Sequence, residues 1–174
     1  MKRVIVVFIL LPLFLIFGGT CVFIWNMTKL DPPKEALLIK NLNEHRADFE
    51  TLRDMLLADT NLSRVAEWGI DRSKPFFLGY PTEQDFPLER FHKYLALLKE
   101  AGGKVAVRGE GPHAYAGNIV WGWGFAGNTH HIGICWMDET PTNLISTLDG
   151  YRSHSEDSVA YRHIDSDWYL WTDL

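Results

Sequence analysis

The chain has 174 residues, of which 47% are hydrophobic and 22% are charged, and its formal net charge is −5. This length is enough for one globular domain that buries a sizeable core. The acidic balance argues against a nucleic-acid-binding protein, because binding to phosphate groups needs a basic surface. We therefore expect no nucleic acid among the partners of the chain.

The first predicted element is a membrane anchor. Residues 4–25 form an uncharged and almost wholly apolar run, which follows Lys2 and Arg3. As a helix, this run would be about 33 Å long, enough to cross a hydrocarbon core of about 30 Å. The two cations place the N-terminus in the cytoplasm. We therefore predict a single-pass protein of the bacterial inner membrane, with residues 1–25 as a signal-anchor and the remainder in the periplasm.

Two other export signals fit the same residues. A cleaved signal peptide also has a basic start and an apolar stretch, but here apolar residues continue past Cys21 to Trp25, which favours an uncleaved anchor. A lipoprotein would carry its lipid on Cys21, although Gly18, Gly19 and Thr20 match such a site poorly. All three alternatives export the rest of the chain.

A linker of residues 26–33 is predicted to join the anchor to a single exported domain, residues 34–174. Pro32 and Pro33 cannot continue a helix but can begin one. The anchor holds two of the 17 Lys and Arg residues and none of the 22 Asp and Glu residues, so the exported part has a formal charge of −7. Cys135 is its only cysteine, so no disulfide can form within the domain.

Two amphipathic helices are predicted in the first two thirds of the domain. Between residues 34 and 58, apolar residues recur every three or four positions with charges between them, which predicts one long helix. Residues 86–101 repeat this pattern, with Asp85 near the cap, Pro87 in the first turn and a glycine pair after the end.

The remaining segments predict mainly strands. Alternating apolar positions and turn residues indicate two hairpins, the first turning at Gly127 and Asn128. Residues 71–81 are expected to form a loop packed on the core, and Thr140 and Pro141 to begin a short helix. The predicted strands cover residues 64–70, 104–108, 119–125, 131–136, 159–163 and 168–171. The whole pattern predicts an α+β fold: an N-terminal transmembrane helix, then two amphipathic helices on an antiparallel sheet of about five strands.

A metal site is one possible use of the histidines. His131 and Cys135 would share one face of a strand but stand about 13 Å apart, whereas zinc ligands lie about 2.0 to 2.3 Å from the metal. His130 would point to the opposite face, so a site would need His113 or His163 from elsewhere in the sheet. We expect no metal and no cofactor.

A nucleophile relay is a second possibility, in which Cys135 would act with His131 or His163 and with Asp165. These residues would have to meet in the fold. The sequence contains no nucleotide-binding glycine loop, HExxH, GxSxG or CxxC motif that would support such chemistry. A single cysteine more often packs as a small hydrophobe. We assign no catalytic residue.

The aromatic residues are the most unusual feature of the domain, since five of the seven tryptophans follow residue 120. Trp121 and Trp123 belong to an alternating pattern that favours the core, although they could instead form a platform for a sugar or a protein. Tyr169 and Trp171 are the aromatic residues we expect to be exposed. The candidate binding residues are Tyr169, Trp171, Trp121, Trp123, His131, His163, Asp165 and Asp167.

Five segments carry a resemblance: EHRADFETLRDMLL, RVAEWGI, YLALLKE, HIGICW and RHIDSDWYLW. Together with the anchor, they resemble small bacterial proteins that have one N-terminal membrane anchor and a short exported domain. Some proteins of this general shape act as immunity partners that neutralise a toxin delivered to the periplasm, an analogy of architecture and address. The group has no assigned catalytic residues, so the resemblance implies none for this chain.

These observations favour a membrane-anchored periplasmic module that binds a protein, as an immunity-type inhibitor of a toxin or effector. A basic partner would suit the acidic domain. One alternative is an envelope enzyme or a binder of cell-wall glycan or peptide, with His131, His163, Asp165 and Cys135 near its site. Another is a scaffold subunit of a membrane complex.

Overall fold

The computed structural model describes residues 31–73, 75–109, 115–125, 128–151 and 159–173, without the side chains of residues 123–125 and 128. The predicted anchor and Cys21 lie outside these ranges. Within them, no helix is both long enough and apolar enough to cross a membrane. Residues Pro33–Leu174 form one compact unit.

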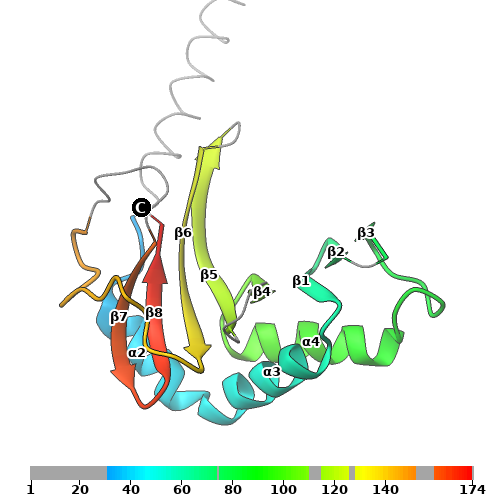
Figure 1. Ribbon diagram of the computed structural model, residues 1–174, viewed down its shortest axis with the longest axis horizontal. Helices are drawn as coiled ribbons and strands as arrows, with labels where there is room; N and C mark the ends of the chain where they lie inside the picture. The colour runs from blue at the N-terminus through cyan, green and yellow to red at the C-terminus, as the bar shows by residue number, and fades with distance from the viewer. Residues whose placement is uncertain (1–30, 74, 110–114, 126–127, 152–158, 174) are drawn as a thin grey trace, which may run out of the picture. The chain divides into compact units, whose positions relative to one another are not determined.

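This unit is an α+β domain in which three helices pack on one antiparallel sheet, as far as the described residues show (Figure 1). The helices are α2 (Glu35–Glu44), α3 (Arg46–Ala58) and α4 (Leu88–Glu100). The strands are β1 (Leu62–Ala66), β2 (Gly69–Arg72), β3 (Phe77–Gly79), β4 (Val105–Arg108), β5 (Tyr115–Phe125), β6 (Asn128–Met137), β7 (Ala160–Asp165) and β8 (Trp168–Thr172). Their order across the sheet is β3-β2-β1-β4-β5-β6-β8-β7.

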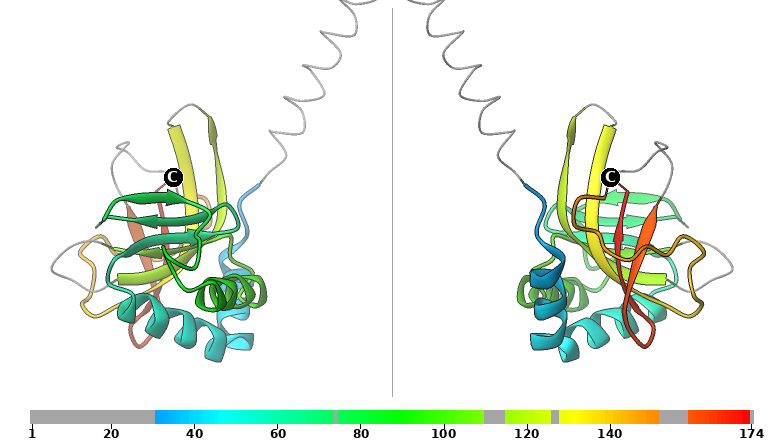
Figure 2. Two further views of the ribbon diagram at one scale, coloured as in Figure 1. Left: turned by 90° about the vertical axis from the view of Figure 1, so that its right-hand side faces the viewer. Right: turned by 90° about the vertical axis from the view of Figure 1, so that its left-hand side faces the viewer.

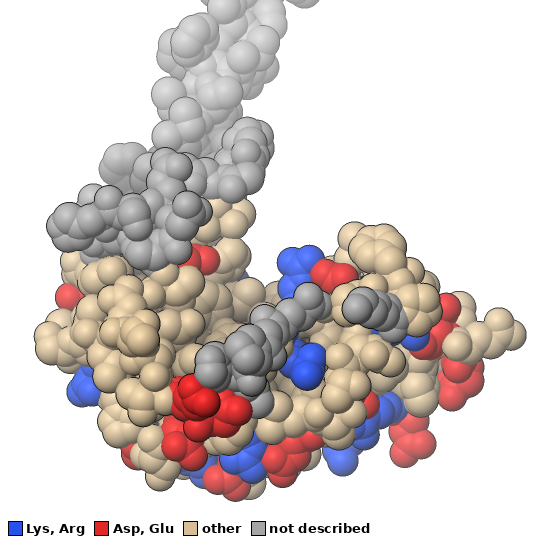
Figure 3. All heavy atoms as spheres, viewed as in Figure 1, with Lys and Arg blue, Asp and Glu red and all other residues tan. Residues whose placement is uncertain are grey.

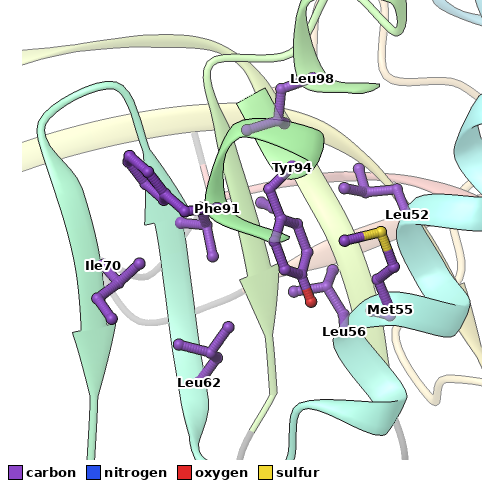
Figure 4. Packing of buried hydrophobic residues seen from close by; sticks show 11 residues of the cluster. Leu52, Met55, Leu56, Leu62, Ile70, Phe91, Tyr94 and Leu98 are labelled. Carbon is purple, nitrogen blue, oxygen red and sulfur yellow. The ribbon is translucent and has the colours of Figure 1, made fainter. Parts of the chain in front are cut away.

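All three helices lie on the same side of the sheet, which we call the helix side; the other side is the open face (Figures 1 and 2). Two buried clusters fill the helix side. The first joins α3 and α4 to β1, β2, β4 and β5, and Figure 4 shows Tyr94 of α4 pointing toward Met55 and Leu56 of α3. The second joins α2 and the start of α3 to β6 and β8. The predicted α+β class is thereby confirmed.

The long helix predicted for residues 34–58 is in fact two helices. His45 separates them with φ −117° and ψ 26°, and its N–H still bonds to the carbonyl of Asn41. The Asn41 side chain donates to the carbonyl of Ala101, just after α4, at 2.7 Å. The break lets α2 bury Leu38 and Leu42 in the second cluster, while most of α3 faces the first. The second predicted helix, 86–101, is confirmed as α4.

The sheet has eight strands rather than about five, because residues 62–79 contribute three. The predicted strand 64–70 is a hairpin, in which Ala66 of β1 pairs with Gly69 of β2. Gly69 has φ 137°, and a Cβ there would lie 2.0 Å from the carbonyl oxygen of Gly79, so only glycine fits. Part of the predicted loop 71–81 is the edge strand β3.

A bulge in β5 changes which side chains face the helices. The strand register shifts between Ile119 and Trp121, so these two residues do not share a face as the simple alternation predicted. Ile119 packs on the open face beside Cys135, whereas Val120 and Trp121 pack against the helix-side cluster. On β6 the predicted alternation holds, with Ile132 facing the helices.

The short helix predicted after Thr140 and Pro141 does not form. Residues 141–150 are irregular, with a single parallel bridge between Leu144 and Tyr161. The carboxylate of Glu35 in α2 accepts hydrogen bonds from the Thr147 hydroxyl (2.8 Å) and the Leu148 N–H (3.0 Å). Because β7 and α2 bind the backbone of this segment, these tertiary contacts outweigh the local preference for a helix.

The final predicted hairpin is confirmed, but the exposure predicted for two of its aromatic residues is not. Trp168 and Leu170 of β8 point into the helix-side cluster, as the alternation indicated. Tyr169 and Trp171, predicted to be exposed, are buried in a small cluster on the open face with Cys135. The prediction was wrong because side chains of β5, β6 and β7 cover both rings. Both faces of β8 are therefore buried.

Candidate functional site

A cleft on the open face is the most promising site among the described residues. It has a volume of about 330 Å³ and lies where β5 and β6 extend beyond the start of β4. Figure 1 shows β5 and β6 on one side of this region and β1–β3 on the other. The lining residues are Arg64, Trp68, Lys104, Val105, Ile119, Gly122, Thr129 and His131.

His131 is the one predicted binding residue that lines this cleft. Its ring Nδ1 lies 2.8 Å from a carboxylate oxygen of Asp173, and the backbone N–H of His131 donates to the other oxygen. Because an ionised carboxylate only accepts hydrogen bonds, Nδ1 carries the hydrogen. Asp173 therefore fixes the orientation of the ring and directs Nε2 away from itself.

Gly122 leaves space next to this ring. The two residues face each other across β5 and β6, and a Cβ at Gly122 would lie 3.1 Å from Cδ2 of His131 and 3.8 Å from Nε2. Glycine at this position therefore keeps the outer edge of the imidazole accessible. No described residue forms a hydrogen bond with Nε2 of His131.

The charged side chains of the cleft are cations. Arg64 is engaged, since its Nε and Nη2 both donate to one carboxylate oxygen of Asp71, at 3.0 and 2.5 Å. Lys104 is exposed and forms no ion pair with any described residue. None of the described lining residues is acidic. Lys104 is thus the lining cation that no described carboxylate compensates.

The structure does not bring together the residues that an enzyme site would need, namely Cys135, His131, His163 and Asp165. His163 lies on β7, with Nε2 at 2.8 Å from the carbonyl oxygen of Ser166, and Asp165 forms an ion pair with Arg46 of α3. His131 pairs with Asp173 instead. The nucleophile relay therefore has no geometric basis.

Cys135 behaves as a core residue. Its side chain is fully buried, and its partners on the two neighbouring strands are Tyr169 and Gly117. A Cβ added at Gly117 would lie 2.8 Å from the Cβ of Cys135, so the packing at this point is close. Burial raises the pKa of the Cys135 thiol well above its ordinary value, so the reactive thiolate is disfavoured. No group of three or more His, Cys, Asp or Glu suited to a metal occurs among the described residues.

None of the other predicted binding residues with a described side chain lines the cleft, although the Trp171 ring lies 6.4 Å from the His131 ring. Asp165 and Asp167 line a second pocket of about 400 Å³ between α3 and the β7–β8 turn, together with Trp136 and Trp168. Arg46 lies over the Trp168 ring at 5.5 Å. The Trp123 side chain lies outside the described parts of the structure, and Trp121 packs on the helix side.

An exposed apolar patch was missed by the sequence analysis. The name covers four exposed side chains near the edge strand β3 and the β1–β2 turn: Trp68 (46% exposed), Phe76 (77%), Leu78 (58%) and Tyr80 (57%). Tyr80 also packs edge-to-face on Phe91 of α4, with the ring centroids 5.0 Å apart. In Figure 3 the surface near β3 is mostly uncharged, with basic and acidic groups next to it over β1 and β2. The alternation around Leu78 was a signal for a strand, but Gly79 and the prolines nearby favoured a loop.

Comparisons with family models, curated proteins and solved structures found no match for the chain. The resemblance to small anchored bacterial proteins therefore stays a prediction.

Proposed function

We propose that this domain is a protein-binding module that works at the bacterial inner membrane as an immunity-type inhibitor. The observation that carries this proposal is the apolar patch of Trp68, Phe76, Leu78 and Tyr80. Exposed apolar groups gathered in one area are typical of protein interaction sites. Aromatic side chains in particular supply much of the binding energy at such sites.

The position of the patch supports a protein partner. β3 is an edge strand that pairs only with β2 in the described sheet, so its other edge is available to a further strand. A partner could add a strand there while Phe76 and Leu78 contact its side chains. The long apolar run at residues 4–25, read as an anchor, would hold this surface near the membrane.

The charge of the domain supports a basic partner. The exported part has a formal charge of −7, and Glu67, Glu83 and Asp85 flank the patch in sequence. Charge complementarity increases the rate of association and selects against partners of the same sign. An apolar centre on a domain of net negative charge fits a basic toxin or effector, with Arg64 and Arg72 as the cations near the patch.

Affinity capture of the full chain from membranes tests this proposal. We expect the chain to recover a basic protein in stoichiometric amount, and its deletion to make cells more sensitive to neighbouring strains. The double variant Phe76→Ser/Leu78→Ser should lose both the partner and the protection. Its thermal stability should change little, because both side chains are more than half exposed.

Leu37→Ser provides the matched control, since Leu37 is 61% exposed but lies on α2, away from the patch. It should retain the partner and the protection. The proposal fails if no stoichiometric protein is recovered and deletion leaves sensitivity unchanged, or if the double variant binds like the unaltered chain.

A further inference from the structure

We propose that the open-face cleft is a second binding site, which takes a small ligand with a carboxylate or phosphate group attached to a flat apolar body. This inference goes beyond the protein-binding proposal, and the two sites share Trp68. It depends on Lys104, His131 and Gly122, which do not belong to the apolar patch.

The charge of the lining points to an anion. Lys104 projects from the start of β4 without an ionic partner among the described residues, and Arg64 adds a guanidinium that Asp71 holds in place. Since the rest of the domain is acidic, anions are repelled from most of its surface. Arg64 and His131 each have a carboxylate partner, Asp71 and Asp173, so Lys104 supplies the uncompensated charge that favours an anionic group there.

The second polar contact comes from His131. Asp173 holds the ring through Nδ1, so Nε2 is the atom left to meet a ligand. In a protonated ring both nitrogens carry hydrogen, and Nε2–H can then donate a charge-assisted hydrogen bond to an anion. Gly122 keeps this edge open, because any larger side chain would extend toward Cδ2 and Nε2.

The apolar part of the ligand would pack between Trp68 and the floor of the cleft. Trp68 is half exposed in the β1–β2 turn, and Val105 and Ile119 pair with each other on β4 and β5 beneath it. A volume of about 330 Å³ lies at the lower end of the range for small-molecule sites. An aromatic ring that bears one anionic group matches this size and lining.

Ligand-observed NMR titration of the purified full chain tests the proposal with three probes: phenyl phosphate, benzoate and the neutral benzyl alcohol. We expect at least one of the two anions to bind with a dissociation constant in the millimolar range, and benzyl alcohol to bind at least about tenfold more weakly. Binding of phenyl phosphate alone would identify a phosphate site. Binding of benzoate would show that a carboxylate is sufficient.

Two substitutions and one control locate the site. Lys104→Gln should weaken binding of the anion about tenfold, and Gly122→Ala should weaken it by a similar factor through steric contact with His131. His163→Gln should leave binding unchanged, because His163 lies on β7 outside the cleft. Circular dichroism of each variant checks that it is folded.

The proposal is overturned if neither anion binds, if benzyl alcohol binds as tightly as the anions, or if Lys104→Gln and Gly122→Ala both bind normally. Failure here leaves the protein-binding proposal intact, because that test changes Phe76 and Leu78. Conversely, loss of the protein partner in the patch variant should leave anion binding unchanged.

Discussion

Gly133, in the middle of β6, explains why Trp171 is buried. Gly133 pairs with Trp171 on the neighbouring strand, and a Cβ at this glycine would lie 2.3 Å from Nε1 of the indole and 2.1 Å from the carbonyl oxygen of Asn118. The missing side chain lets the indole lie directly over the strand. A single residue on β6 thus determines where a large residue of β8 is placed.

The variant Gly133→Ala should therefore be strongly destabilised. A methyl group would force the backbone of Asn118 and the ring of Trp171 to move, at a cost of about 1 to 3 kcal/mol in the free energy of unfolding. Urea unfolding followed by tryptophan fluorescence measures this cost. Gly122→Ala is the control, since its methyl group would meet only the edge of His131 at 3.1 Å. Equal stability of the two variants would contradict the argument.

At the scale of elements, α2 organises the irregular segment 141–150 through Glu35. The Glu35 carboxylate, whose side chain is 12% exposed, binds Thr147, the Leu148 N–H and the Arg162 guanidinium, the last at 3.2 Å. These contacts connect α2 to a segment more than 100 residues away and to β7. The segment is ordered by tertiary contacts, because its own sequence would otherwise favour a helical turn.

Glu35→Ala should loosen segment 141–150. The loss leaves the Leu148 N–H without its acceptor and removes the carboxylate partner of Arg162, which should cost about 2 to 3 kcal/mol in the free energy of unfolding. Hydrogen exchange at the Leu148 amide should accelerate. Glu44→Ala serves as the comparison, since its pair with Lys40 is largely exposed and should contribute no more than about 0.5 kcal/mol. Unchanged exchange at Leu148 would refute this role for Glu35.

At the scale of the whole molecule, both core regions contain groups that stay protonated in the folded state. Burial raises the pKa of the Tyr94 hydroxyl, which also donates to Asp59 at 2.7 Å in the cluster of Figure 4. Burial likewise raises the pKa values of Tyr115 and Cys135 on the open face. The domain therefore keeps these three protons at a pH where the unfolded chain releases them.

The domain should consequently lose stability in alkali. The unfolded thiol ionises near pH 8.5 and the unfolded phenols near pH 10, whereas the folded groups ionise at higher pH. Each group thus lowers the free energy of unfolding by up to about 1.4 kcal/mol per pH unit above its unfolded pKa. Urea unfolding between neutral pH and pH values above these unfolded pKa values measures this slope.

Tyr94→Phe should reduce the alkaline slope, because one of the three retained protons is removed. It should also cost about 1 kcal/mol at neutral pH through the lost hydrogen bond to Asp59. Leu37→Ala, at an exposed site without a titrating group, should keep the full slope. If stability stays constant above pH 10, the three groups do not contribute as proposed.

Only part of the candidate site could be predicted from the sequence. His131 was identified because it alternates with apolar residues on a recognisable strand. Its partner Asp173 lies 42 residues further along the chain and follows the last strand, where no local pattern indicates a role. Lys104 was placed at the end of a predicted strand and Trp68 within another, 64–70. That both line one cleft with Gly122 depends on the order of the strands.

The sequence by itself determined the α+β class, helix α4, the strand alternation of β6 and the hairpin of β7 and β8. These features depend on the local period of apolar residues, which reports the face that each element buries. Only the tertiary structure decided the break at His45, the three strands within residues 62–79, the irregular segment 141–150 and the burial of Trp171. Each of these results from contacts between residues distant in sequence, where backbone pairing and close packing outweigh local preference.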